Sequence, residues 1–463
     1  MPTRLPTTTG TRSPWRSSGF RVLFFASTLS VLGTNVSYVA VPLVAVLALD
    51  AGPGQVGLLA SLSTAAFLLI GLPAGAWVDR LRPGTVLAVA DLLRGGLLAW
   101  VPLAWWFDVL TFEGLCVAVF LSGVATVFFD VASQSALPQL VGPESLVPAN
   151  SAMVSLMAAG NVAGRGAGGA LVQLVGAPAA VVCAAVGYLG SGLRLVRTAR
   201  SGARGTTAAP GGAGRGPDLR ALISEGLRHV LRHGELRALA LTGALGNLGT
   251  VMVNTMLPVV FSRELGLSAG ALGLFWAVGG VGLFLGARCA RRLADRFGHG
   301  RGLVLADVCL APTGLLVPLM DRGVWLWAAG AGWLLFAVRT GTSNVLGVSL
   351  RQRLTPGTLL GRMNATFRFL LTGAMALGAG LAGAMGAYAS PRAALWAGGA
   401  LLCLSFVPTL ASPLRGRRAL PPAGTEGSAD LAPRPPDDGT QRRASAEPLP
   451  PGGPTRSRRD PDA

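Results

Sequence analysis

The chain has 463 residues, of which 51% are hydrophobic and only 13% are charged, whereas soluble domains are about 25% charged. This composition excludes an ordinary soluble protein. All 39 basic residues are arginine, and the absence of lysine from the sequence excludes a phosphate-binding P-loop and a Schiff-base lysine.

Twelve long apolar stretches follow one another along the chain. Each is long enough to cross about 30 Å of hydrocarbon as an α-helix. The sequence therefore predicts an all-α polytopic membrane protein with twelve transmembrane helices in two six-helix halves. The stretches are residues 20–49, 54–78, 84–107, 112–131, 147–175 and 178–197, followed by 236–262, 269–293, 302–320, 324–350, 359–387 and 392–412.

Polar segments divide the chain into five regions. The two ends are rich in Pro, Gly and Arg, and we expect them to be disordered because such a composition cannot bury a core. The regions are a disordered cytoplasmic N-terminus (1–18), the first half (19–197), a cytoplasmic linker (198–235), the second half (236–412) and a disordered cytoplasmic tail (413–463).

The linker contains an amphipathic segment, DLRALISEGLRHVLRH at residues 218–233. Its apolar residues fall on one helical face, which predicts a helix lying on the membrane or under the first half. His229 and His233 are four residues apart, but no third ligand is near, so we expect a solvated polar face. The five cysteines lie in apolar stretches without a CxxC pair, and we predict no metal site.

Arginine placement predicts the topology. With the N-terminus inside, the inside segments hold 32 of the 39 arginines, and the outside loops hold only Arg263, Arg322 and Arg392. The positive-inside rule therefore places both termini in the cytoplasm of a plasma-membrane protein. The net charge of +18 then reflects topology, and no nucleic-acid partner is expected.

The second half repeats the first at an offset of 216 residues. A near-constant offset over more than 100 residues indicates two related six-span halves, which is typical of transporters with a cavity at the midplane of the membrane. The matches include Gly57 with Gly273, Asp79 and Arg80 with Asp295 and Arg296, and Asp91 with Asp307.

Two loop motifs occupy equivalent places in the halves. GAWVDRLRPGT starts at Gly75 and RRLADRFGHGR starts at Arg291, and both resemble the Gly-x-Leu-Ala-Asp-Arg-x-Gly-Arg signature of the major facilitator superfamily. An Asp in a tight turn can accept from a neighbouring helix N-terminus and from basic partners. The resemblance implies a conformational latch formed by Gly75, Asp79, Arg80, Asp295 and Arg296.

A wider pattern resembles the branch of the superfamily that contains the enterobactin exporter and the macrolide-efflux proteins. It rests on Asp91-x-x-Arg94, on the stretch FFDVASQSALPQLVGPESLVPANSAM from Phe128, and on EGLRHVLRH. The resemblance covers about residues 19–410. The chain departs from it at Gln134, where that branch often has an arginine, and in a loop between spans 4 and 5 without basic residues.

Span 5 contains a glycine stripe, GNVAGRGAGG. Gly160, Gly164 and Gly168 predict close packing against a neighbouring helix that can slide or rock. The stretch resembles the antiporter signature Gly-x-x-x-Gly-Pro-x-x-Gly-Gly, with Arg165 in the Pro position. It also matches GxGxxG, but no strand precedes it, so no dinucleotide site is predicted.

Charged side chains inside the spans are costly and are functional candidates. Asp91 and Arg94 are three residues apart and can pair. Asp130 is expected to pair with Arg80 or Arg82, whereas Arg339 depends on Asp307 if spans 9 and 10 pack favourably. The candidates for buried charge and proton coupling are Asp91, Arg94, Asp130, Arg165, Asp307, Arg339 and Arg368.

The expected cavity is mostly apolar, with hydrogen bonds from Asn35, Asn247, Asn254 and Asn344. Asp91 is the favoured proton-coupling candidate. More arginine than aspartate in the spans favours an anionic or neutral amphipathic substrate, and an apolar wall favours broad binding.

These patterns predict a secondary active transporter that works by alternating access. Export of a small hydrophobic or amphipathic compound (drug, macrolide or siderophore type) driven by the proton gradient is favoured, with no other cofactor, and the protein is expected to act as a monomer in the bilayer. The alternatives are import of a small metabolite and a lipid-handling protein. GLSAG, from Gly266, matches a nucleophile elbow, but it lies opposite all three histidines across the membrane, so we predict no enzyme.

Overall fold

A computed structural model describes residues 13–78, 80–141, 145–201 and 219–417, and within these ranges the secondary structure is helical without strands. Most of the two ends expected to be disordered lie outside the described residues. The described parts of those ends form the short helical turns η1 (Pro14–Arg16) and η7 (Pro413–Gly416).

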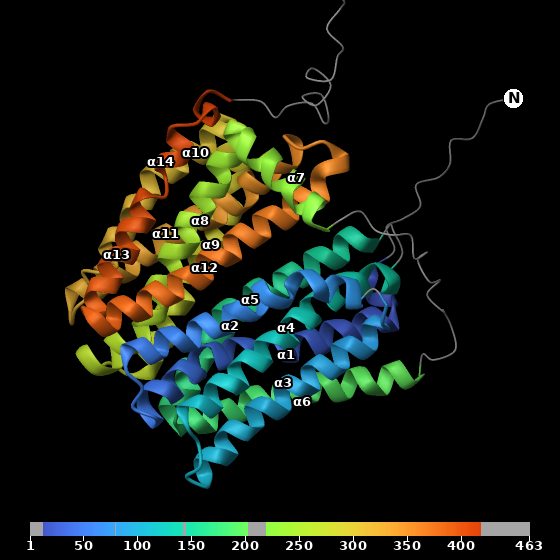
Figure 1. The fold of residues 1–463 in the computed structure, drawn as a ribbon, viewed down its shortest axis with the longest axis vertical. Helices are drawn as coiled ribbons and strands as arrows, with labels where there is room; N and C mark the ends of the chain where they lie inside the picture. The colour runs from blue at the N-terminus through green and yellow to red at the C-terminus, as the bar shows by residue number, and fades with distance from the viewer. Residues whose placement is uncertain (1–12, 79, 142–144, 202–218, 418–463) are drawn as a thin grey trace, which may run out of the picture.

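The first six long helices form one bundle and the later ones a second bundle beside it (Figure 1). The second bundle contains two spans that are broken into shorter pieces, α10 with the 3-10 helix η5, and α13 with α14. The first bundle contains α1 (Ser18–Leu43), α2 (Pro53–Val78), α3 (Pro83–Trp106), α4 (Phe112–Leu140), α5 (Leu146–Val175) and α6 (Ala177–Ser201); the second contains α8 (Gly234–Val259), α9 (Ala269–Phe297), α10 (His299–Leu310), η5 (Ala311–Leu316), α11 (Val324–Arg353), α12 (Leu360–Tyr388), α13 (Pro391–Leu404) and α14 (Val407–Leu410).

Nine helical stretches among the described residues are long and apolar enough to cross a membrane. The remaining three spans of the twelve-helix fold are α5, α11 and α10 with η5. The helix starts follow from capping groups that satisfy free backbone N–H groups. The side chains of Thr111, Ser268 and Ser390 accept from backbone amides at the starts of α4, α9 and α13.

The internal repeat is visible in the backbone. The last turn of the first span is a π-helix, η2 (Val44–Ala48), and the seventh span ends in the equivalent π-helix, η4 (Val260–Glu264). The two π-helices are related by the offset of 216 residues found in the sequence. The halves are therefore similar in local geometry as well as in sequence.

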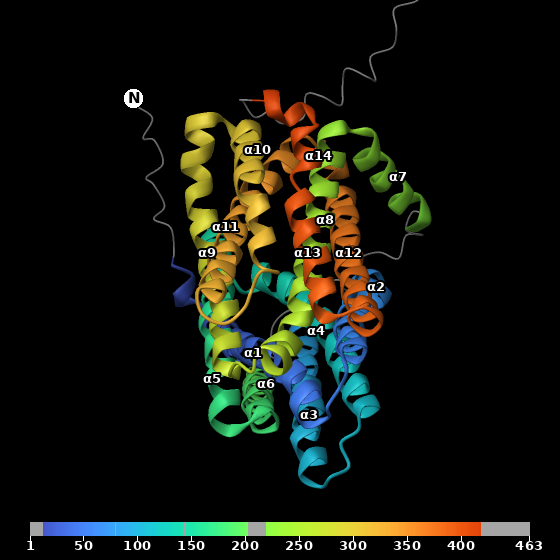
Figure 2. The same ribbon diagram turned by 90° about the vertical axis from the view of Figure 1, so that its left-hand side faces the viewer.

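The linker helix α7 (Leu219–Arg232) packs against α8 and α12 of the second half (Figure 2). Glu225 forms an ion pair with Arg362, and a Cβ at Gly226 would lie 3.0 Å from the backbone oxygen of Arg362. The alternative that this helix lies under the first half is therefore wrong.

The halves contact each other along two seams, α2 with α12 and α5 with α9. In each seam a pair of glycines lets the backbones approach: a Cβ at Gly57 would lie 2.1 Å from the Cα of Gly383, and one at Gly169 would lie 2.7 Å from the Cα of Gly273. The ribbons join at one end and diverge toward the other (Figure 1).

At the joined end an ion pair links the two halves. Arg263, in η4, contacts Asp50 at 2.6 Å and donates to the backbone oxygen of Val46 at 3.3 Å. The amide of Gly270 also donates to the side chain of Gln173 at 3.1 Å. The loops between α1 and α2 and between η4 and α9 therefore close this end.

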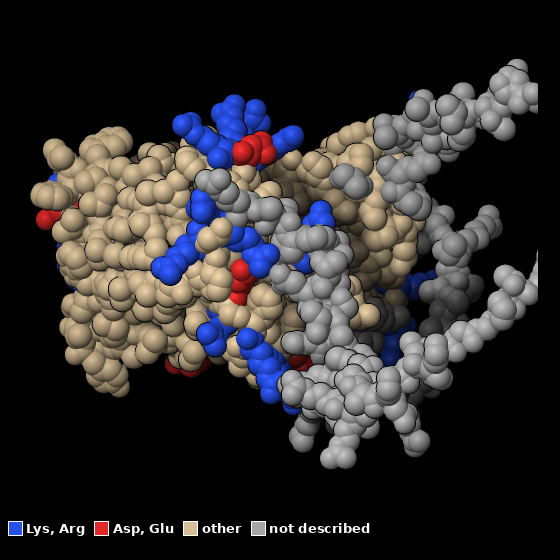
Figure 3. Space-filling model, turned by 90° about the horizontal axis from the view of Figure 1, so that it is seen from above, with Lys and Arg blue, Asp and Glu red and all other residues tan. Residues whose placement is uncertain are grey.

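Exposed arginines gather on one face of the molecule (Figure 3). They come from α7, the end of α9 and the start of α10, all of which belong to segments that the arginine count assigns to the inside. They include Arg228, Arg232, Arg291, Arg292, Arg296 and Arg301.

Candidate transport site

A cavity of about 360 Å³ lies between the two halves and is lined mainly by α1, α2, α4 and α8. Its wall is largely apolar and includes Val56, Leu59, Phe67, Val119 and Trp276. A larger hollow of about 620 Å³ lies at the joined end but has no charged side chain in its lining. The smaller cavity is the better candidate because apolar walls with a few polar groups are typical of ligand sites.

The polar part of the wall comes mostly from the first half. Ser122, Thr126 and Asp130 lie four residues apart on α4, which places them on one helical face, and all three line the cavity. Ser63 and Thr64 on α2 line it beside them. A Cβ at Gly123 would lie 3.1 Å from the backbone oxygen of Ser63, so the two helices pack closely at this point.

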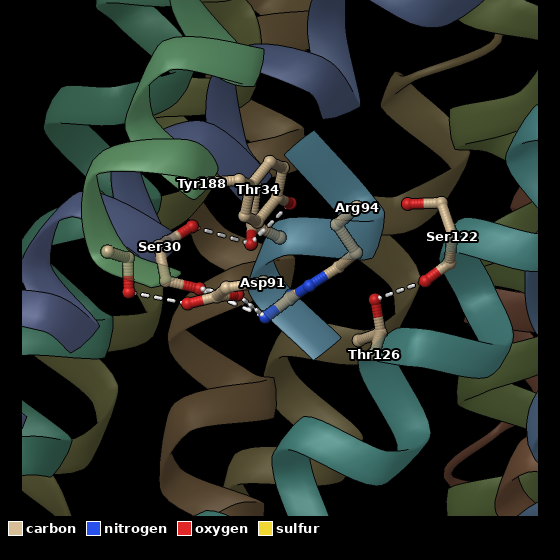
Figure 4. Close-up of polar contacts among 8 residues, drawn as sticks. Ser30, Thr34, Asp91, Arg94, Ser122, Thr126 and Tyr188 are labelled. Carbon is tan, nitrogen blue, oxygen red and sulfur yellow. Dashed lines mark hydrogen bonds and ion pairs between the residues drawn. The ribbon is translucent and has the colours of Figure 1, made fainter. Parts of the chain in front are cut away.

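Asp91 and Arg94 form a fully buried ion pair between α1, α3 and α6 (Figure 4). Ser30 donates to Asp91 at 3.2 Å, and Ser191 donates to its other carboxylate oxygen. The Arg94 guanidinium also lies 4.5 Å from the ring centre of Tyr188. Every side of this pair is occupied, so it ties three helices together.

The second half contains the equivalent carboxylate with a different cation. Asp307, on α10, lies 2.8 Å from the guanidinium of Arg339, on α11. Ser343 and Thr409 donate to the two carboxylate oxygens at 3.0 and 2.9 Å. A Cβ at Gly246 would lie 3.5 Å from Arg339, so the glycine leaves room for the guanidinium. The structure thus supplies the packing of spans 9 and 10 on which this pair depends.

The expected pairing of Asp130 with Arg80 or Arg82 is wrong. Both arginines are exposed, and no ion pair joins them to Asp130 in the described part of the chain. The charges that act on Asp130 are those of Arg94 and Arg368. The reason is position: Asp130 lies ten residues before the end of α4, deep in the helix.

Arg165 and Arg368 lie near the cleft and stack on aromatic rings. Arg165 donates to Asn35 at 3.3 Å and lies 4.3 Å from the ring centre of Tyr38. Arg368, from the second half, lies 4.3 Å from the ring centre of Phe67 in the first. Neither arginine lines the cavity. With Arg94 and Arg339 paired as well, the cavity wall has no arginine among the described residues.

The four candidate asparagines separate. Asn254 lines the cavity and accepts from the indole N–H of Trp276 at 2.7 Å. Asn35 is buried behind the wall, Asn247 is half-buried and Asn344 is exposed. The structure therefore places one of the four at the site.

The glycine stripe of span 5 packs against α1 within the first half. A Cβ at Gly160 would lie 2.2 Å from Val31, one at Gly164 would lie 2.7 Å from Asn35, and one at Gly168 would lie 3.1 Å from the backbone of Val36. The predicted close packing is present. The seam between the halves instead uses the next residue, Gly169.

The proposed latch is open at the diverging end. Asp79 lies outside the described residues, and Gly75 belongs to α2. Arg80 is exposed, and Asp295 contacts Arg291 of its own helix at 4.0 Å. Arg296, also on α9, lies over the ring of its neighbour Phe297. Among the described latch residues no contact crosses between the halves.

The residues that sequence reasoning missed are the hydroxyl groups and aromatic rings of the wall. The spacing of Ser122 and Thr126 before Asp130 was visible in the sequence. The edge-to-face contact of Tyr38 with Trp276, at 5.1 Å, joins the two halves and had no signal in the local pattern.

No cluster of three His, Cys, Asp or Glu side chains suited to a metal occurs within the described ranges. The rings of His229 and His233 are 6.4 Å apart on α7. Burial, and secondly the neighbouring His233, lowers the pKa of His229 from its ordinary value of 6.5.

Comparisons with known proteins agree with this architecture. The chain is 26% identical to an uncharacterized MFS-type transporter of Sinorhizobium fredii, covering 80% of this chain and 89% of the relative. It is 27% identical to the enterobactin exporter EntS of Salmonella choleraesuis, covering 81% and 87%. The structure of a bacterial homologue of the iron transporter ferroportin in an inward-facing state superposes with a TM-score of 0.69 at 18% identity, covering 86% of this chain and 99% of the other.

The family model of the Major Facilitator Superfamily matches residues 23–350, which is more than half of the chain. Members of this family are transporters, and the relatives and structural neighbours above are transporters as well. The chain is therefore a multi-pass membrane transporter of small molecules that belongs to the major facilitator superfamily.

Proposed function

We propose that the protein exports a small, neutral, amphipathic compound across the plasma membrane in exchange for protons. In this proposal both termini lie in the cytoplasm, and the cavity faces the cytoplasm in the conformation described. The positive-inside pattern supports this orientation, because the arginine-rich segments are at the end where the halves diverge. Similarity to enterobactin exporters supports the outward direction.

Asp130 is the observation on which proton coupling rests. Asp91 and Asp307 are both fully buried and each is paired with an arginine. Asp130 lines the cavity, and no hydrogen-bond donor among the described residues reaches its carboxylate. A carboxylate that exchanges protons during transport needs access to the cavity, so the coupling role that Asp91 was expected to have is assigned to Asp130.

Charge gives Asp130 a way to affect the conformation. One of the charges acting on it, Arg368, belongs to the opposite half. Ionised Asp130 attracts this arginine across the cleft, and protonation removes the attraction. Because electrostatic interactions are strong in a weakly polar medium, the protonation state would bias the distance between the halves.

Accumulation in a pump-deficient bacterial host tests this proposal. Fluorescent dyes, macrolides and siderophores are followed with and without a protonophore, in cells with the wild type, Asp130→Asn or the control Asp108→Asn, which changes an exposed loop carboxylate. We expect low accumulation that rises with the protonophore for the wild type and the control. Full, protonophore-sensitive efflux by Asp130→Asn would refute the coupling role, and higher accumulation with the wild type would indicate import.

A further inference from the structure

The hydroxyl groups of the cavity wall have already used their protons. Thr34, Ser37, Ser63, Thr64 and Thr126 each donate to a backbone carbonyl three or four residues earlier in the same helix, at 2.7 to 3.2 Å. Serine and threonine commonly make this bond in helices, since it satisfies the hydroxyl proton locally. What such a hydroxyl presents to the cavity is an oxygen lone pair.

The first-half wall therefore consists of hydrogen-bond acceptors. A hydroxyl has one donor and two acceptor lone pairs, and the donor is committed in each of these five residues. The phenol of Tyr188 donates to Thr34 at 2.9 Å. Asp130 continues the same surface on α4 with a carboxylate, which accepts only.

The second-half wall differs in hydrogen-bonding character. The carbonyl oxygen of Asn254 is occupied by the indole of Trp276 at 2.7 Å, so its amide NH₂ remains as a donor group. The cavity is asymmetric: acceptors on α1, α2 and α4 face mostly apolar groups across about 360 Å³. An acceptor that loses its water without gaining a donor costs free energy.

We propose that this wall selects substrates with an apolar body and O–H or N–H donor groups along one edge. The donor edge binds the oxygens of α2 and α4, and the apolar body packs against the valine, leucine and aromatic side chains of the cavity. An ether or ester of the same shape leaves those oxygens without partners. This inference rests on the proposed transport function and names the substrate class of the same cavity.

A matched pair of probes tests the hydrogen-bonding preference directly. Umbelliferone and its O-methyl ether differ by one donor, and at mildly acidic pH the phenol is neutral. Binding of each is measured by fluorescence to the full-length protein in lipid nanodiscs, without a proton gradient. The variants are the double substitution Ser122→Ala with Thr126→Val, and the control Thr340→Val, which removes the same kind of bond, to Phe336 on α11, outside the cavity.

The expected result is that the wild type and the control bind the phenol more tightly than the ether, by roughly three- to ten-fold for one hydrogen bond. In the double variant the ratio falls to about one, while the affinity for the ether is unchanged, which shows that the cavity is intact. Equal affinities in the wild type, or an undiminished ratio in the double variant, would overturn the proposal.

This readout is separate from the test of transport. Binding at equilibrium involves neither direction nor a proton gradient. If Asp130→Asn keeps protonophore-sensitive efflux while the phenol-to-ether ratio behaves as expected, coupling fails and the substrate class stands. If efflux depends on Asp130 but the ratio is one in the wild type, the substrate class fails and coupling stands.

Discussion

The glycine contact between α2 and α12 gives the sharpest test of how the halves move. A Cβ added at Gly57 would lie 2.1 Å from the Cα of Gly383, whereas carbon atoms in contact are about 3.5–4.0 Å apart. Gly57→Ala therefore requires the two helices to separate by about 1.5 Å. Overpacking of this size costs about 1–3 kcal/mol. Both partners are backbone atoms, so no side chain can move aside.

The cost applies only while the halves are joined at this end. Gly57→Ala should shift the population toward conformations open there by roughly 5- to 150-fold, since each 1.36 kcal/mol is a factor of ten. The control Gly361→Ala lies on α12, where an added Cβ meets nothing within 4 Å. The comparison separates steric contact at the seam from a general effect of alanine on helices.

Spin labels on the two halves measure the shift. Asp108→Cys and Asp321→Cys place labels on exposed loops of opposite halves, in a background where the five native cysteines are replaced by serine. Gly57→Ala should increase the fraction of long distances relative to the wild type and Gly361→Ala. An unchanged distance distribution would refute the idea that this contact holds the joined state.

Three further outcomes follow from the ion pairs and from α7. Arg94→Leu leaves Asp91 buried without its cation, so we expect a loss of about 3–5 kcal/mol in thermal unfolding of the purified protein; adding Asp91→Asn should recover part of it, and no recovery would exclude charge burial as the cause. Arg263→Gln removes the ion pair with Asp50 at the joined end and should shift the spin-label distances in the same direction as Gly57→Ala but by less, because Asp50 is 97% exposed; a double-mutant cycle with Asp50→Asn that shows no coupling would contradict this. Because burial lowers the pKa of His229, the docked α7 disfavours the protonated form, so docking is most stable above pH 6.5 and weakens as pH falls through the lowered pKa; hydrogen exchange in α7 should accelerate on acidification in the wild type but not in His229→Gln.

The seam glycines show how far the sequence reaches. The offset of 216 residues pairs Gly57 with Gly273, so equivalent glycines in the two halves were visible. Their contact partners, Gly383 and Gly169, were not, because each contact joins helices that are more than 100 residues apart. A repeat in sequence identifies equivalent positions but gives no distance between halves.

The buried charges show the same limit. Asp91 and Arg94 are three residues apart on one helix, and that spacing alone places them together. Asp307 follows Asp91 in the repeat, yet its cation comes from α11 and not from its own helix. Asp130 was assigned the wrong partners because its distance to Arg368 depends on how the second half lies against the first.

Hydropathy and arginine placement along the chain determined twelve helices, two related halves and the identity of the charged groups inside the spans. These are properties of single helices and of short spacings, for which 3.6 residues per turn is sufficient geometry. Only the tertiary structure decided which carboxylate reaches the cavity, which hydroxyl oxygens form its wall and which end of the two halves is closed. Those features depend on the packing and tilt of helices distant in sequence, where small residues such as Gly57 set how closely two backbones approach.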